Sequence, residues 1–506
     1  MKRIILLLLF LITAICRAET NQIRILYFND FHGFAEPHRP LGAAEELGGA
    51  AWLAARVRQL REEKPSLFLA AGDMIQGDNW ANLFQGESVV QLLNQMGLDA
   101  MVLGNHEFDF GQEVLWSRIG EARFPVLGAN VRGAKGVVPH VVKEVGGIRV
   151  AIVGILGADT ALTTHPRNLS GLVLLDPAQS LAAEVERLSP HVDLLVALTH
   201  CGFGTDRDLA SRVKGVQVIV GGHSHTKVDV PALVGDTLVV QAWEHGKALG
   251  VLDLWLEGKK VIHWEGRLEE IRASAGPPDP AIHELVKHYS MKLRGLLDKV
   301  IGISLVDLDG EAVRDRETNL GNLVADVLKE VSGAQVAVIN GGSIRKSIPK
   351  GQISMGDVYG ALPFDNYLVA IPVKGTLLWD ALEHGLRGRG GGRFPQVSGL
   401  SISYVADPKG LRLKEVKVNG LSLDPEAIYV VAVNDFLAAG GDGYKSFSEA
   451  IRNSAMPYLV GGTLVAEGLV FSEPGRWIRD LVAEYISKKS PITAKTEGRI
   501  QEMEGP

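Results

Sequence analysis

The sequence predicts an α/β protein with two domains and a helix between them. Residues 22 to about 273 alternate apolar runs of strand length with helical stretches, which is the pattern of a layered α/β domain. Residues 274–280, SAGPPDP, cluster helix- and strand-breaking residues and indicate a domain boundary. Apolar residues then recur with helical spacing up to residue 300, and strands mixed with helices follow over 301–506.

The first 18 residues are typical of a signal peptide. Lys2 and Arg3 precede an apolar stretch from Ile4 to Ile15, and cleavage is expected after Ala18. This stretch is shorter than the roughly 20 apolar residues that a membrane-spanning helix needs. We therefore expect an exported protein, periplasmic or extracellular, that is soluble after cleavage. Lipidation of Cys16 is the alternative interpretation.

Five apolar runs in the first domain lead into residues of the types that bind metals. They are IRILYFNDFH with Asp30 and His32, LFLAAGD with Asp73, AMVLGNHEFD with Asn105, His106 and Asp109, LLVALTH with His200, and VIVGGHSH with His223 and His225. Sites in open α/β sheets lie beyond the carboxyl ends of the strands, so we expect these ends to meet at one edge of one sheet. Carboxylates, imidazoles and an amide suit divalent zinc, manganese or iron. Their number fits two metals that share a bridging carboxylate.

Each of these strand ends also has a structural interpretation. A single histidine at a strand end is more often a hydrogen-bonded structural residue than a ligand, and the residues GNHE and GGHSH form turns readily. Five such endings within about two hundred residues favour the metal site.

Five residues of the second domain lie next to turns or glycine-rich loops that end predicted helices and strands. Arg314 and Arg345 offer planar guanidinium groups that match phosphate or carboxylate oxygens. Phe364 and Phe436 stand where an element breaks into a polar loop, so their own domain buries their rings poorly. Asp442 lies on a GGDG turn, where its carboxylate suits a pair of sugar hydroxyls. Taken singly, each is typical of a core ring or a surface charge, but their positions favour a ligand site.

Other features argue against several classes of function. The net charge of −7 is against a nucleic-acid coat or a polybasic membrane surface. The glycine-rich run 387–393 lacks the Gly-Lys-Ser/Thr ending of a P-loop, so we assign it no phosphate role. Of the two cysteines, only Cys201 follows the predicted leader, so an internal disulfide is not expected.

The order and content of these motifs resemble the calcineurin-like metallophosphoesterases, and more narrowly the secreted 5'-nucleotidase / UDP-sugar hydrolase family. The N-D-x-H-G motif of that family corresponds to Asn29–Gly33, and its T-N-L-G-N, N-G-G-x-I-R, L-P-F and N-x-F-L-A-x-G-G-D-G motifs are present in the second domain. The resemblance implies a four-layer α/β/β/α sandwich over 22–273, a linker and helix over 274–300, and an α/β nucleotide-binding domain over 301–506.

The resemblance also implies a role for each site residue. Asp30, His32, Asp73 and His225 would bind one metal, and Asp73, Asn105, His200 and His223 the other, with Asp73 as the bridge. His106 and Asp109 match the catalytic pair of the family. The substrate residues would be Arg314 and Arg345 for the phosphate and neighbouring oxygens, Asn340 as the amide, Phe364 and Phe436 for the base, and Asp442 for the ribose.

The function expected on these grounds is an exported dimetal hydrolase that releases phosphate from nucleoside 5'-phosphates through attack of a water held by zinc, manganese or cobalt. Alternatives on the same scaffold are hydrolysis of UDP-sugars or nucleoside di- and triphosphates, a 2',3'-cyclic nucleotide phosphodiesterase/3'-nucleotidase, and a sulfur-oxidation thiosulfohydrolase. A surface binding protein without turnover is an alternative from another class. The expected partner is a small-molecule nucleotide, with no nucleic acid and no stable membrane anchor, and the sequence leaves the oligomeric state open.

Overall fold

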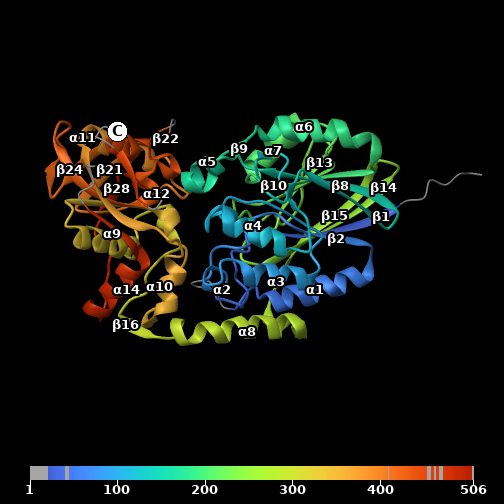
Figure 1. Cartoon of the computed structure of the whole chain (residues 1–506), viewed down its shortest axis with the longest axis horizontal. Coiled ribbons are helices and arrows are strands. Elements are labelled where there is room, and N and C mark those ends of the chain that lie inside the picture. The colour runs from blue at the N-terminus through green and yellow to red at the C-terminus, as the bar shows by residue number, and fades with distance from the viewer. Residues whose placement is uncertain are drawn as a thin grey trace, which may run out of the picture.

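The computed structural model describes residues 21–39, 45–407, 410–452, 457–460, 463–466 and 471–503. The predicted leader, 1–18, lies outside the described residues. The described chain forms two lobes that are joined along one side by a long helix (Figure 1).

Two sheets stacked face to face form the N-terminal lobe. The first has the order β15 (Lys260–Glu270), β14 (Ala248–Glu257), β1 (Asn21–Phe28), β2 (Ser66–Ala70), β3 (Ala100–Val102), β4 (Val126–Leu127) and β6 (Val137–Val138). The second has the order β12 (Ala232–Val234), β13 (Thr237–Gln241), β11 (Val218–Gly221), β10 (Leu194–His200), β8 (Ile148–Leu156) and β7 (His140–Val145). A small ladder pairs β5 (Val131–Arg132) with β9 (Val173–Leu174).

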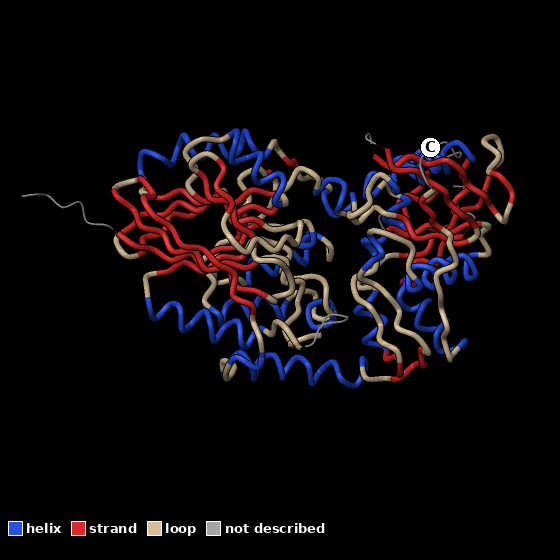
Figure 2. Tube along the Cα trace, turned by 180° about the vertical axis from the view of Figure 1, so that it is seen from behind, coloured by secondary structure: helices blue, strands red, loops and turns tan. Residues whose placement is uncertain are grey.

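Helices cover the outer face of each sheet, which confirms the predicted α/β/β/α layers (Figure 2). Helices α1 (Ala50–Glu63), α3 (Glu87–Met96) and α4 (Gln112–Glu121) pack on the first sheet, and α6 (Pro177–Leu188) and α7 (Phe203–Arg212) pack on the second. Between the sheets, side chains such as Ile25, Leu69, Val196 and Val220 form a fully buried core. Two short helices, α2 (Asn79–Asn82) and α5 (Thr160–Thr163), lie on the side that faces the second lobe.

The expectation that the five ligand-bearing strands share one sheet is wrong. Strands β1, β2 and β3 belong to the first sheet, whereas β10 and β11 belong to the second. All five are apolar and buried along most of their length, and such runs look alike in sequence whichever sheet they join. The ligands therefore meet at the mouth of a two-sheet sandwich.

The predicted linker helix is α8, Pro280–Leu297, which confirms the helical spacing. The Asp279 side chain accepts hydrogen bonds from the Ala281 and Ile282 N–H groups, and proline at the first helical position suits a helix start. Ile282, Val286 and Tyr289 are buried in the core of the N-terminal lobe. The helix is therefore anchored to that lobe through its apolar face and leads the chain into the second.

The C-terminal lobe is a second α/β unit. Its main sheet has the order β20 (Pro395–Ser398), β17 (Val336–Asn340), β24 (Ile428–Asn434), β19 (Tyr367–Lys374) and β27 (Phe471–Trp477). A second sheet has the order β23 (Leu421–Ser422), β22 (Gly410–Val418), β21 (Leu400–Asp407) and β28 (Ile500–Glu502). Two further ladders pair β16 (Val300–Ser304) with β18 (Gly351–Ser354), and β25 (Pro457–Val460) with β26 (Thr463–Ala466). The helices are α9 (Asn319–Ser332), α10 (Met355–Ala361), α11 (Gly375–Leu386), α12 (Asp435–Ala438), α13 (Lys445–Arg452) and α14 (Ile478–Lys489).

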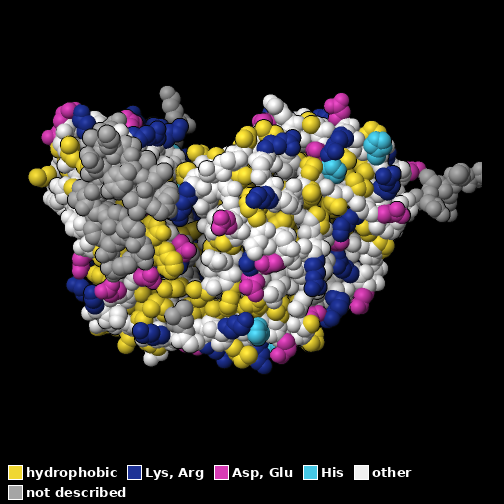
Figure 3. Space-filling view, in the orientation of Figure 1, with side chains coloured by type: hydrophobic (Ala, Val, Ile, Leu, Met, Phe, Trp, Pro, Cys, Tyr) yellow, Lys and Arg dark blue, Asp and Glu magenta, His cyan; other side chains and the backbone are white. Residues whose placement is uncertain are grey.

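On the face seen in Figure 3, basic and acidic side chains are interspersed. Among the described residues, no helix combines the length and the apolar character needed to cross a membrane.

Candidate active site

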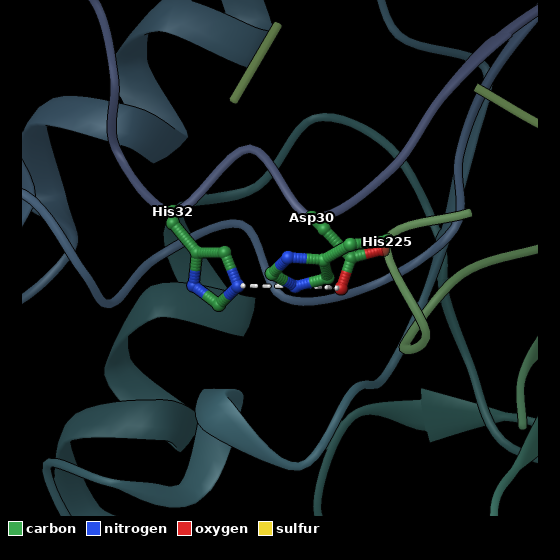
Figure 4. Close-up of side chains that lie close together, drawn as sticks. All are labelled: Asp30, His32 and His225. Atoms are coloured by element: carbon green, nitrogen blue, oxygen red, sulfur yellow. Dashed lines mark hydrogen bonds and ion pairs between the residues drawn. The ribbon is translucent and has the colours of Figure 1, made fainter. Parts of the chain in front are cut away.

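The first predicted metal site is assembled from the loop after β1 and the loop after β11. Asp30, His32 and His225 bring one ligand atom each within 4.8 Å of one another (Figure 4). The Nε2 atom of His225 lies 3.2 Å from Asp30 Oδ1 and 3.3 Å from His32 Nε2. The other ring nitrogen of His32, Nδ1, lies 2.8 Å from the Gln76 carbonyl oxygen, which leaves Nε2 facing the cluster.

The second predicted metal site lies next to the first and draws on β2, β3, β10 and β11. Asp73, His200 and His223 form a second group of ligand atoms within 4.8 Å. His223 Nδ1 lies 3.0 Å from Asn105 Oδ1, while its Nε2 lies 2.8 Å from Asp159 Oδ2. Asp73 Oδ2 is 3.1 Å from His200 Nε2 and 3.9 Å from His32 Nε2, so this one carboxylate faces both groups.

The electrostatics of the clusters fit bound cations. Burial lowers the pKa of His200, but the Asp73 carboxylate raises it, and the net result is a pKa of about 10. Burial also lowers the pKa of His225, but the Asp30 carboxylate raises it, and the net result is a pKa of about 9. Buried carboxylates thus impose a field that stabilises positive charge. The buried Nε2 of His200 lies 3.1 Å from Asp73 Oδ2, as expected of a ligand atom that shares a cation with the carboxylate.

Five of the seven predicted ligands have a left-handed backbone. The φ angles are 49° for Asp30, 49° for His32, 56° for Asp73, 78° for His223 and 52° for His225. This region is uncommon for residues with a Cβ atom and costs on the order of 1–3 kcal/mol each. Such strain persists only where the surrounding structure fixes it. The strand ends are therefore bent so that these side chains turn into the site.

The predicted catalytic pair is in contact. His106 Nδ1 lies 2.7 Å from Asp109 Oδ2, within one 3-10 turn that begins at His106. Burial alone would lower the pKa of His106, but Asp73 and Asp109 outweigh it and the pKa is raised. The ring nitrogen that is free of Asp109, Nε2, lies 4.0 Å from Asp73 Oδ2. His106 is thus oriented toward the metal clusters.

Glu107 is a buried residue of the site that the sequence analysis missed. Its carboxylate accepts hydrogen bonds from the backbone N–H groups of Asp73 (2.9 Å), Met74 (2.7 Å) and Gly104 (2.6 Å). It therefore ties the loop after β2 to the loop after β3. Burial and the Asp73 carboxylate raise the pKa of Glu107 to about 7. The only sequence signal was its place inside the GNHEFD motif, where it could equally have been a solvated turn residue.

Glu244, also missed, holds the outer side of His225. One carboxylate oxygen contacts His225 Nδ1 and the other accepts from Lys247 Nζ at 2.6 Å. An acidic partner on one ring nitrogen fixes the tautomer and leaves the other nitrogen for a metal. Glu244 and His225 form a further group of ligand-type atoms with His245. Both oxygens of Glu244 are already engaged, one by His225 and the other by Lys247. We therefore interpret Glu244 as a residue that orients His225 and not as a further metal ligand.

The six predicted substrate residues all line one cleft between the lobes, with a cavity volume of about 640 Å³. They are Arg314, Asn340, Arg345, Phe364, Phe436 and Asp442, and they share the cleft with Asp73, Asn105, His106, Asp109, His223 and His225. The cleft thus joins the metal clusters of one lobe to polar and aromatic groups of the other.

Arg345 of the C-terminal lobe reaches across to the N-terminal lobe. Its guanidinium Nη2 lies 3.3 Å from His32 Nε2, although the two residues are 313 positions apart. Its Cζ atom lies 5.8 Å from the centre of the Phe364 ring, and that ring lies 5.7 Å from the His106 ring. Burial and the nearby Arg314 lower the pKa of Arg345 to about 10. Two guanidinium groups held together in this way favour an anionic ligand.

Asp442, in the part of the cleft wall that the C-terminal lobe forms, has a left-handed conformation with φ of 53°. Its Oδ2 accepts a hydrogen bond of 2.7 Å from the amide of Asn340. The run 387–393, which we expected to be a turn without a phosphate role, lines this cleft as well. Its backbone is bonded to the loops of the site, since the Gly342 N–H donates to the Gly392 carbonyl at 2.7 Å. Its glycines therefore form part of the wall, a position that the sequence did not indicate.

This combination of fold and site defines a metallophosphoesterase. The family model of calcineurin-like phosphoesterases matches residues 23–227, and that of the 5'-nucleotidase C-terminal domain matches residues 300–449. The chain is 32% identical to the 5'-nucleotidase of Homo sapiens over 95% of this chain and 91% of that protein. The chain belongs to the 5'-nucleotidase family.

Three further proteins are similar to this chain. A trifunctional nucleotide phosphoesterase protein of Bacillus subtilis (strain 168) is 32% identical over 95% of this chain, which spans only 35% of that protein. The crystal structure of a 5'-nucleotidase precursor from Thermus thermophilus has a TM-score of 0.85 and 36% identity, covering 96% of this chain and all of that one. The sulfate thiohydrolase SoxB of a Thermus species shares the fold, with a TM-score of 0.78 at 21% identity over 96% of this chain and 97% of that one.

The Glu107 contacts generate a prediction about the integrity of the site. In Glu107→Ala, the buried N–H groups of Asp73, Met74 and Gly104 lose their acceptor, and each such loss costs about 1–3 kcal/mol. We expect the free energy of unfolding to fall by at least about 3 kcal/mol, together with the amount of metal retained per chain. Thermal melting and elemental analysis measure the two effects.

Glu113→Ala is the matched control, because Glu113 is an exposed carboxylate on the next helix. A Glu107→Ala protein that melts and retains metal like this control would contradict the role given to Glu107.

Proposed function

We propose that this protein releases phosphate from nucleoside 5'-phosphates at the cleft between its lobes. The observation that carries the proposal is the continuity of one 640 Å³ cleft, which is lined by predicted metal ligands at one end and by two arginines, two aromatic rings and a carboxylate elsewhere. A nucleotide has an anionic phosphate, a ribose diol and an aromatic base, and each has a chemical counterpart in this cleft.

Two divalent cations would be held by the seven predicted ligands, with Asp73 shared between them. Asp30, His32, Asp73 and His225 would hold one, and Asp73, Asn105, His200 and His223 the other. The donor set of nitrogen and oxygen atoms suits zinc, manganese or cobalt. When bound, a pair of such ions polarises phosphoryl oxygens and lowers the pKa of water toward neutrality.

The protein's own groups would orient the phosphate and stabilise its developing charge. Arg345 and Arg314 offer guanidinium donors to its oxygens. His106 is held by Asp109 through Nδ1 at 2.7 Å, so its Nε2 is directed toward the reacting group. In the charged form, which its raised pKa favours, the imidazolium would stabilise the leaving oxygen and supply it with a proton.

The nucleoside would be recognised by the second lobe. Phe364 and Phe436 are both half-buried and line the cleft, as expected of rings that stack on a base. Stacking contributes about 1–3 kcal/mol per base and tolerates different bases, because each base has a π-face. Asp442, supported by Asn340, would accept hydrogen bonds from the ribose hydroxyls.

The alternative functions differ in the part of the substrate that would lie against the second lobe. A thiosulfohydrolase has no use for paired rings and a diol-binding carboxylate, so these groups favour a nucleotide. UDP-sugars, nucleoside di- and triphosphates and 2',3'-cyclic nucleotides stay open as further substrates. We also propose export, which the leader-like residues 1–18 support, and the domain limits 22–273, 274–300 and 301–506.

Activity should depend on divalent metal. Dialysis against a chelator is expected to abolish phosphate release from AMP, and zinc, manganese or cobalt should restore it, because the carboxylates and imidazoles alone cannot neutralise a phosphoryl group. A colorimetric phosphate assay measures this. Full activity in protein shown by elemental analysis to be free of metal would exclude the proposal.

His106 should act on the reaction without holding a metal. His106→Ala is expected to keep its metal content while kcat for AMP falls by about 10² to 10⁴, the range typical of one positioned acid–base or electrostatic group. Elemental analysis alongside kinetics separates the roles. If the variant loses metal together with activity, His106 is a ligand and the assignment is wrong.

Phe364 and Phe436 should bind the base. Truncation of either ring to Ala is expected to lower kcat/KM for AMP by about 1–3 kcal/mol, the contribution of one stacked base. Hydrolysis of p-nitrophenyl phosphate, which has no base, should change far less. The melting temperature is the control, because loss of a core ring would destabilise the protein and depress both substrates in parallel.

A further inference from the structure

The loop that carries Phe364 is held from behind by a residue outside the cleft. The loop, residues 362–366, connects α10 to β19 in the main sheet of the C-terminal lobe. Its residues Pro363, Phe364 and Asp365 line the cleft, whereas Arg479 stands in the first turn of α14. The direction of the Phe364 ring therefore depends on what fixes the backbone on either side of it.

Arg479 makes contacts on both sides of Phe364 with one guanidinium group. Nη1 donates a hydrogen bond of 3.1 Å to the Pro363 carbonyl oxygen, and Nη2 pairs with the Asp365 carboxylate. The Arg479 residue is only 5% exposed, whereas Asp365 is exposed, so solvent screens the pair with Asp365 more than the hydrogen bond to the Pro363 carbonyl. A planar guanidinium can serve two acceptors at once in a fixed geometry, which an ammonium group cannot reproduce.

The guanidinium is itself fixed between two aromatic rings. Its Cζ atom lies 4.2 Å from the Trp477 ring centre and 4.8 Å from the Tyr359 ring centre, distances at which a cation is attracted to the ring faces. The Tyr359 hydroxyl donates to Asp480 at 2.8 Å, which ties α10 to α14. Arg479 thus has contacts with Tyr359 and Trp477 that do not depend on the loop 362–366.

The N-terminal lobe reaches the same carbonyl. Asn82 Nδ2 donates to the Pro363 oxygen at 3.2 Å and also to Gly77 at 2.7 Å. Gly77 lies in the segment that follows the Asp73 loop. The Pro363 carbonyl therefore accepts one hydrogen bond from each lobe. Asn82 donates from the N-terminal lobe, and Arg479 donates from the C-terminal lobe, which also carries Phe364.

We propose that Arg479 is a positioning residue for nucleotide capture, which holds the Phe364 ring in the orientation that stacks on the base. The inference rests on the base-binding role proposed above for Phe364. A loop that is ordered before binding loses less conformational entropy when the base arrives, so the support strengthens binding rather than the chemical step. Arg479 touches neither the phosphate end of the cleft nor the predicted metal ligands.

The test compares AMP with p-nitrophenyl phosphate in Arg479→Met, which keeps the apolar stem and removes the fork. We expect KM for AMP to rise about fivefold or more, the lower end of the loss expected for one stacked ring. The kcat for AMP and both constants for p-nitrophenyl phosphate should stay within about twofold. Arg479→Lys should behave like Arg479→Met, because charge without the fork does not replace both contacts.

Arg499→Met is the matched control. Arg499 also makes a forked pair, to Asp326 at 2.7 and 2.9 Å, in the same lobe but away from the cleft. Its loss should lower the melting temperature without changing the ratio of AMP to p-nitrophenyl phosphate activity. Asp365→Ala is the milder second variant, since it removes one acceptor of the fork from an exposed position; it should raise KM for AMP in the same direction.

A double-mutant cycle decides whether Arg479 acts through Phe364. In a Phe364→Ala background, Arg479→Met should raise KM for AMP no further. A purely structural role would lower the activity of Arg479→Met on AMP and on p-nitrophenyl phosphate in parallel with its melting temperature. If this is found, and Asp365→Ala leaves KM for AMP unchanged, the inference is overturned. If Phe364→Ala loses activity on AMP but not on p-nitrophenyl phosphate, while Arg479→Met shows no such AMP-specific loss, the role of Arg479 is overturned and the proposed base site stands. The absence of an AMP-specific loss in all of these variants overturns the proposed base site as well.

Discussion

The Asp73 carboxylate is the group around which the site is built. Its Oδ2 faces His200 at 3.1 Å, His32 at 3.9 Å and His106 at 4.0 Å, and its Oδ1 accepts the backbone N–H of His106 at 2.9 Å. A buried carboxylate is costly unless cations or donors surround it. The field of Asp73 raises the pKa of both His200 and His106 despite their burial. The same field favours the divalent cations that the family requires.

That arrangement constrains the backbone around it. Asp73 itself has a φ of 56°, and a Cβ atom on the neighbouring Gly104 would lie 2.2 Å from its Oδ1. Glycine is therefore the residue that allows the loop after β3 to approach the carboxylate. Glu107 holds the two loops together by accepting backbone hydrogen bonds from both. The strain of the left-handed residues is thus offset by contacts that the rest of the lobe supplies.

The two lobes carry different parts of the candidate active site. The ligand-type side chains stand on loops at the mouth of a sandwich with a fully buried core, which keeps their relative positions fixed. The aromatic and arginine groups stand on the second lobe and reach the first through contacts such as Arg345 with His32 and Pro363 with Asn82. Arg345 therefore both lines the cleft and contacts the opposite lobe.

The sequence by itself determined the elements and the chemical character of the site. Helix α8 spans Pro280–Leu297, within the stretch whose helical spacing the sequence showed, and the apolar runs before Asp30, Asp73 and His200 are strands. Both signals are local, because helix and strand periodicity is written in neighbouring residues. The tertiary structure alone decided that these strands divide between two sheets, that Glu107, Glu244 and Arg479 support residues of the site, and that the run 387–393 lines the cleft. Such features depend on contacts between distant segments and on left-handed angles imposed by them, and no pattern of neighbouring residues specifies either.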